Sequence, residues 1–78
     1  MGWIDLERKK RIATGQKKYG PIRPKIDPRC FTEEATFELL DAINYLTWAR
    51  VKGEITLSKW RMLDCSIRFV LEMLKISS

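Results

Sequence analysis

Apolar residues recur at helical spacing in two long stretches of the second half of this chain. In the stretch that ends near Val51, they return every three or four positions and form one apolar face: Ala35, Leu39, Ala42, Ile43, Leu46 and Ala49. Residues 58–76 carry a wider stripe of the same kind: Trp60, Leu63, Ile67, Val70, Leu71 and Leu74. Both patterns predict amphipathic helices. Lys52-Gly53 ends the earlier helix, so a short turn and an antiparallel hairpin are predicted.

A third, thinner apolar pattern covers residues 3–18 and predicts a first helix. Gly20-Pro21 ends it, since glycine is common just after a helix and proline cannot continue one. Residues 21–27 are predicted to be an extended connector, because a residue before proline avoids the helical region. The sequence leaves two candidate N-caps open for each later helix: Asp27 or Thr32 for the second, and Ser58 or Thr56 for the third.

These elements predict an all-α, three-helix domain, since no alternating strand pattern persists and 78 residues allow one domain at most. A basic helix and connector occupy residues 1–29, and the helical hairpin of the second and third helices occupies residues 30–78. The first helix is predicted to pack across the hairpin. Trp48 and Trp60 are predicted to be core or interface residues. Because three short helices leave apolar surface uncovered, we also expect a homo-oligomer.

The chain contains no histidine and only two cysteines, Cys30 and Cys65. A Ser-His-Asp or Cys-His site is therefore excluded within this chain, and two thiols alone do not fill a zinc site. Catalysis would have to use carboxylates, lysines, tyrosines or a hard metal ion. No secretory signal is recognised, so we expect reduced thiols and a cytoplasmic location. No apolar run approaches the length of a membrane helix, so no membrane partner is expected.

Positive charge is concentrated in the first third of the chain. Residues 1–29 hold nine basic and three acidic residues, a net charge of +6, whereas residues 30–78 hold six and seven, a net charge of −1. The basic strip favours contact with phosphate, from a nucleotide or a nucleic acid. Tyr19 is the only aromatic residue within this strip, which runs from Arg8 to Arg29, so base stacking has little support. The alternative is an ordinary solvated helix surface.

Three acidic residues of the second predicted helix, Glu34, Glu38 and Asp41, recur at i, i+4 and i+7. A period of 3.6 residues places them within about 40° of one line along the helix. Their mutual repulsion would be offset by a divalent cation such as Mg²⁺, which prefers carboxylates, water and phosphate oxygens. The alternative is a solvated acidic surface near a helix N-terminus, where the helix dipole favours anions.

The segment 32–46, TEEATFELLDAINYL, resembles the motif helix of MazG-like all-α nucleoside triphosphate pyrophosphohydrolases. Glu38-Leu39-Leu40-Asp41 matches the Glu-x-x-Asp pair of that family, with Glu34 as the preceding carboxylate. The stretch 11–20, RIATGQKKYG, is similar to the start of short phage-encoded members. The family normally supplies a second acidic pair from the next helix, whereas residues 58–76 offer only Asp64 and Glu72.

The resemblance implies a Mg²⁺-dependent enzyme that splits a nucleoside triphosphate into a monophosphate and pyrophosphate, or a degenerate relative of one. In that hypothesis Glu38 and Asp41 are catalytic. The metal ligands are Glu34, Glu38, Asp41 and Asp64; Arg11, Lys17 and Lys18 contact phosphate; Asn44 and Tyr45 contact base or sugar. The alternative function is a non-enzymatic helical interaction module, including one that binds nucleic acid through residues 8–29.

Overall fold

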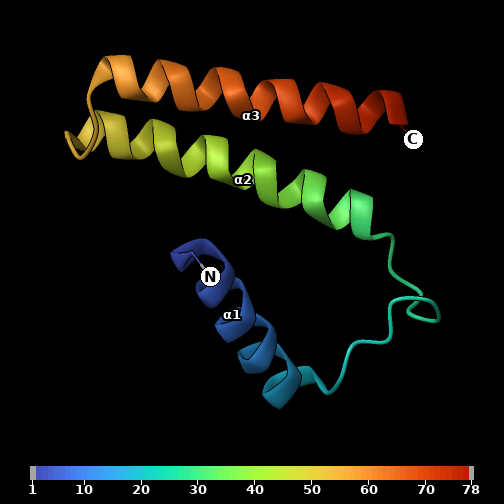
Figure 1. Cartoon of the computed structure of the whole chain (residues 1–78). Coiled ribbons are helices and arrows are strands. Elements are labelled where there is room, and N and C mark those ends of the chain that lie inside the picture. Colours follow the sequence, from blue (N-terminus) through green and yellow to red (C-terminus); the bar gives the residue numbers. More distant parts are fainter. Residues whose placement is uncertain (1, 78) are drawn as a thin grey trace.

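The computed structural model describes residues 2–77, with side-chain exposure for residues 2–75, and shows three helices (Figure 1). They are α1 (Trp3–Tyr19), α2 (Phe31–Lys52) and α3 (Leu57–Ser77). No strand occurs within the described residues. The predicted all-α class and the approximate extent of each helix are therefore confirmed.

α2 and α3 run antiparallel beside each other and form the predicted hairpin (Figure 1). The half-buried apolar side chains of the two helices lie on the predicted faces: Leu39, Ala42, Ile43, Leu46 and Ala49 on α2, and Trp60, Leu63, Ile67, Leu71 and Leu74 on α3. We call the contact between these two faces the seam. No side chain among residues 2–75 is fully buried, so the seam is the only apolar packing that the described residues show between helices.

The turn of the hairpin explains where its two helices end and begin. Gly53 has a left-handed backbone, φ 87°, which costs glycine little and L residues more. Its N–H donates to the Arg50 carbonyl at 3.0 Å, and the N–H of Glu54 donates to the Ala49 carbonyl at 2.8 Å. Thr56 then caps α3, since its hydroxyl oxygen accepts the Lys59 N–H at 3.1 Å. Of the two candidate caps, Thr56 is confirmed and Ser58 is wrong.

The start of α2 differs from both predicted caps. The helix begins at Phe31 with Cys30 in the cap position, and no side chain accepts a capping hydrogen bond there. Asp27 instead closes a local loop, since its carboxylate accepts the Arg29 N–H at 2.9 Å and is bridged by the Arg29 guanidinium at 2.9 and 2.8 Å. The hydrogen bonds from the Arg29 side chain, and to a smaller extent the one from its backbone N–H, lower the pKa of Asp27 to about 2.

The predicted packing of α1 across the hairpin is wrong. Within residues 2–77, α1 makes no helix–helix contact, and it stands apart from α2 and α3 (Figure 1). Its apolar residues point in different directions: Ile4 and Leu6 are about 160° apart around the helix. Charged residues surround the rest of its circumference, so α1 has no continuous apolar face to bury.

Candidate functional site

The predicted metal ligands on α2 form an exposed row. Glu34, Glu38 and Asp41 are all exposed, and no ion pair to them is seen in the described part of the chain. Tyr45 and Asn44, the predicted base or sugar contacts, are exposed one turn further along the same helix. The sequence thus placed these five residues correctly on one helix, and the structure adds that solvent reaches all of them.

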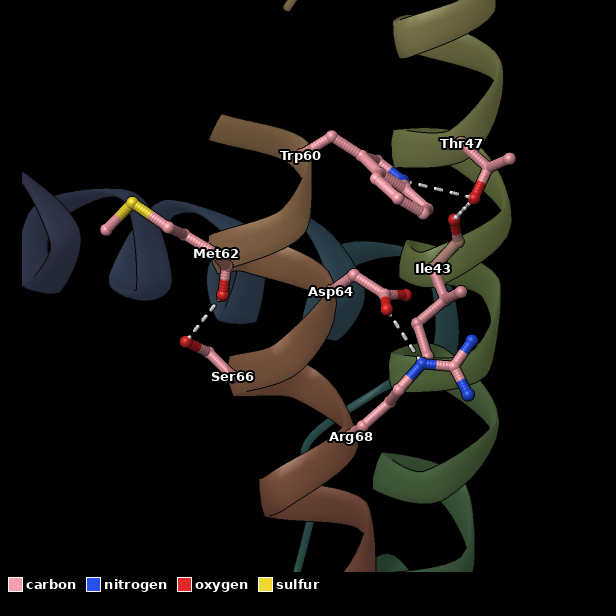
Figure 2. Close-up of polar contacts among 7 residues, drawn as sticks. All are labelled: Ile43, Thr47, Trp60, Met62, Asp64, Ser66 and Arg68. Atoms are coloured by element: carbon pink, nitrogen blue, oxygen red, sulfur yellow. Dashed lines mark hydrogen bonds and ion pairs between the residues drawn. The ribbon is translucent and has the colours of Figure 1, made fainter. Parts of the chain in front are cut away.

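Asp64, the fourth predicted metal ligand, lies apart from this row. It is on α3 at the seam, with 17% of its side chain exposed, and one carboxylate oxygen accepts the Arg68 Nε–H at 2.8 Å. Figure 2 shows this pair on the side of α3 that faces α2. The other oxygen, Oδ1, is shielded from solvent and has no hydrogen-bond partner within the described residues. The position of Asp64 facing α2 was predictable, because Asp64 flanks the apolar stripe of α3. Its ion pair with Arg68 has the i, i+4 spacing that is favourable on a helix.

One polar contact across the seam joins Trp60 of α3 and Thr47 of α2. The Trp60 indole N–H donates to the Thr47 hydroxyl at 3.4 Å, and that hydroxyl donates to the Ile43 carbonyl at 2.8 Å (Figure 2). Arg50 covers the Trp60 ring at 5.0 Å. Trp60 is half-buried, as predicted, whereas Trp48 is 60% exposed on the opposite side of α2.

A groove at the open end of the hairpin has a volume of about 590 Å³. Leu40, Leu71 and Leu74 give it an apolar wall, and Glu33, Glu72 and Lys75 supply its charge. None of the three carboxylates of the acidic row lines this groove. Within the described residues, the structure gathers no group of three acidic or thiol side chains suited to a metal ion.

The predicted phosphate contacts lie on the isolated helix. Arg11, Lys17 and Lys18 are exposed on α1, and α1 does not contact the helix that carries the acidic row. The structure therefore does not bring the predicted phosphate contacts and the predicted metal ligands into one site.

The basic segment carries cations that the protein itself leaves unpaired. On α1, Asp5 pairs with Arg8 and Glu7 pairs with Lys10, each at 3.2 Å, and on the connector Asp27 pairs with Arg29. Six basic side chains then remain without an ion pair in the described part of the segment: Lys9, Arg11, Lys17, Lys18, Arg23 and Lys25. We call these six residues the basic surface.

Comparisons of the chain with protein-family models, with curated proteins and with solved structures find no match. The likeness to MazG-like enzymes therefore stays a prediction from the motif residues. None of the three helices, as far as the structure describes them, combines the length and apolar character needed to cross a membrane. Both cysteines are exposed free thiols.

Proposed function

We propose that this protein is a non-enzymatic helical interaction module whose basic surface binds the phosphate backbone of nucleic acid. The isolation of α1 is the observation that supports this most directly, because a helix with charges all around it gains nothing from packing on the hairpin. A polyanion can supply the binding partner that α1 lacks, because its phosphates pair with cations on several sides of the helix. The counterions released from the polyanion favour this binding. The hairpin then serves as the folded body of the module.

The proposal includes self-association and a cytoplasmic location with both thiols reduced. Self-association multiplies the basic surface, and two linked sites bind one polyanion more tightly than either alone. Tyr19, beneath Lys18 at 5.3 Å, is the only ring on the basic part of α1, so contacts to phosphate rather than base stacking carry the affinity.

The salt dependence of binding tests the proposal. If all six cations of the basic surface contact phosphate, the logarithm of the association constant for duplex DNA should fall with the logarithm of salt with a slope of about −5. The measurement is fluorescence anisotropy of a labelled duplex between low and physiological salt. Lys17→Gln/Lys18→Gln should make the slope shallower by about two.

Lys59→Gln/Arg61→Gln is the matched control, since it removes the same charge from α3. This control should leave the slope nearly unchanged. Equal effects of the two double variants would contradict a localised basic surface, and a flat salt dependence would contradict nucleic-acid binding.

A MazG-like pyrophosphohydrolase is the second candidate, favoured by the three unpaired carboxylates of the acidic row. In this candidate Glu34, Glu38 and Asp41 hold Mg²⁺, which supplies charge neutralisation and an activated water at the triphosphate. The fit is partial, because Asp64 is paired with Arg68 at the seam and the described residues provide no second acidic pair.

Thermal unfolding with Mg²⁺ and a panel of nucleoside triphosphates tests the second candidate. A nucleotide at a hundred times its dissociation constant should stabilise the protein by about 2.7 kcal/mol, and Asp41→Asn should abolish the rise in melting temperature. Glu54→Gln, in the turn of the hairpin, is the control and should keep it. No rise with any nucleotide would remove this candidate, while nucleic-acid binding tolerates the loss of Asp41.

A further inference from the structure

α2 carries a second apolar strip outside the seam, with Leu40 at the edge that also lines the groove beside Leu71 and Leu74. Its members are large and exposed, between 45% and 78% for Phe37, Leu40, Trp48 and Val51. All four lie within about 40° of Asn44 around the helix, whereas the seam residue Leu46 is about 160° away from Asn44. We call Phe37, Leu40, Asn44, Trp48 and Val51 the outer strip.

The protein exposes more surface than a folded monomer of its size. Its accessible surface is 7143 Å². A compact monomer of 9.2 kDa exposes about 4,900 Å², so the excess is about 2,200 Å². The excess includes the surface of the unpacked α1, and it is larger than the roughly 800 Å² that a standard protein interface removes from each partner.

The outer strip is symmetric about its centre. Phe37 and Val51 are each seven residues from Asn44, and Leu40 and Trp48 are each four residues from it. When two such helices run antiparallel around a two-fold axis at Asn44, Phe37 faces Val51 and Leu40 faces Trp48 of the other copy. We propose that a second copy of this chain covers the outer strip in this way, which identifies the surface behind the self-association in the proposed function.

The charges of α2 favour the same arrangement. Glu33, Glu34, Glu38 and Asp41 lie in the first half of α2, and Arg50 and Lys52 lie in its last turn. Antiparallel pairing brings the acidic end of one α2 toward the basic end of the other, whereas parallel pairing sets like charges together. The two Asn44 amides meet on the axis, where each offers both a donor and an acceptor and thereby fixes the register.

α1 of the same chain is a poorer occupant for the outer strip. Trp3, Ile4, Leu6 and Ile12 are all about half exposed or more, but they do not share one side of α1. Packing any side of α1 on the strip would also bury charged side chains against Phe37 and Leu40. A second α2 presents a continuous strip of the same length instead.

Site-specific disulfide cross-linking tests the two-fold axis. In a Cys30→Ser/Cys65→Ser background, Asn44→Cys should oxidise to a covalent dimer of twice the 9.2 kDa chain mass. Oxidised glutathione takes up the two electrons and two protons of each new disulfide. Phe37→Cys alone and Val51→Cys alone should stay uncross-linked, and a mixture of these two variants should form the covalent dimer.

Sedimentation equilibrium of the uncross-linked background chain separates the possible failures. A mass of two chains together with the predicted cross-linking pattern supports the proposal. Two chains without cross-linking at Asn44→Cys or in the mixture would overturn this interface and leave self-association standing. A mass of one chain would overturn both, and would make α1 or solvent the occupant of the outer strip.

Discussion

Ile67→Asp should separate α2 from α3 and unfold the hairpin. Ile67 is half-buried in the middle of the seam, where a new carboxylate would lose hydration without gaining a partner. Because the seam is the only helix–helix packing within residues 2–77, no other contact offsets the loss. We expect the free energy of unfolding to fall by about 2–3 kcal/mol. Thermal and urea unfolding followed by far-ultraviolet circular dichroism measures this loss.

Met62→Asp is the matched control for that substitution. Met62 is on the same helix, is 71% exposed and points away from α2 (Figure 2). The same charge placed there should change the free energy of unfolding by no more than about 0.5 kcal/mol. If the two variants lose equal stability, the seam is not what holds the hairpin together.

The seam was predictable because both of its helices have a strong apolar period. Leu39, Ile43 and Leu46 on α2 and the stripe of α3 were all expected to face inward, and the structure makes each of them half-buried except Val70, which is exposed. The apolar period predicts this face because each helix buries its apolar side against the other helix. The turn at Gly53 followed from a glycine's tolerance of the left-handed backbone.

The placement of α1 was not predictable in the same way. Ile4, Leu6 and Ile12 make up the thin apolar pattern of residues 3–18, but Leu6 lies about 160° from Ile4 and about 120° from Ile12 around the helix. The prediction that α1 packs on the hairpin therefore rested on the number of helices alone. In the structure α1 does not pack there, because its apolar stripe is too weak. Asp27 does not cap α2, because its carboxylate accepts hydrogen bonds from Arg29 before the helix begins.

The sequence predicted which residues of the candidate site lie together on one helix, but not which residues of another helix join them. Spacing alone placed Glu34, Glu38 and Asp41 in one row, and the structure shows that row exposed. Whether a carboxylate on another helix joins the row depends on tertiary contacts and on competing partners. Arg68, four residues after Asp64, is such a competitor, and the i, i+4 spacing was the signal that could have identified it.

Asp64→Leu should stabilise the hairpin by about 1–2 kcal/mol. Trp60, Asp64, Ile67, Leu71 and Leu74 follow a spacing of four, three, four and three residues, so Asp64 occupies a seam position that suits an apolar side chain. Its Oδ1 is shielded and lacks a hydrogen-bond partner among the described residues, and burying such an oxygen costs free energy. Arg68 is 65% exposed, so water solvates its guanidinium once the carboxylate is gone.

Arg68→Leu should have the opposite effect, although it breaks the same ion pair. It leaves the Asp64 carboxylate at the seam without its cation, which should cost about 1–3 kcal/mol. Urea unfolding of both variants at neutral pH measures the two signs. Equal losses would mean that the pair itself stabilises the hairpin, and stability would then be a sufficient reason for an acid at the seam. Opposite signs would mean that the acid weakens the hairpin, so its presence would need another cause, such as a cation bound in place of Arg68.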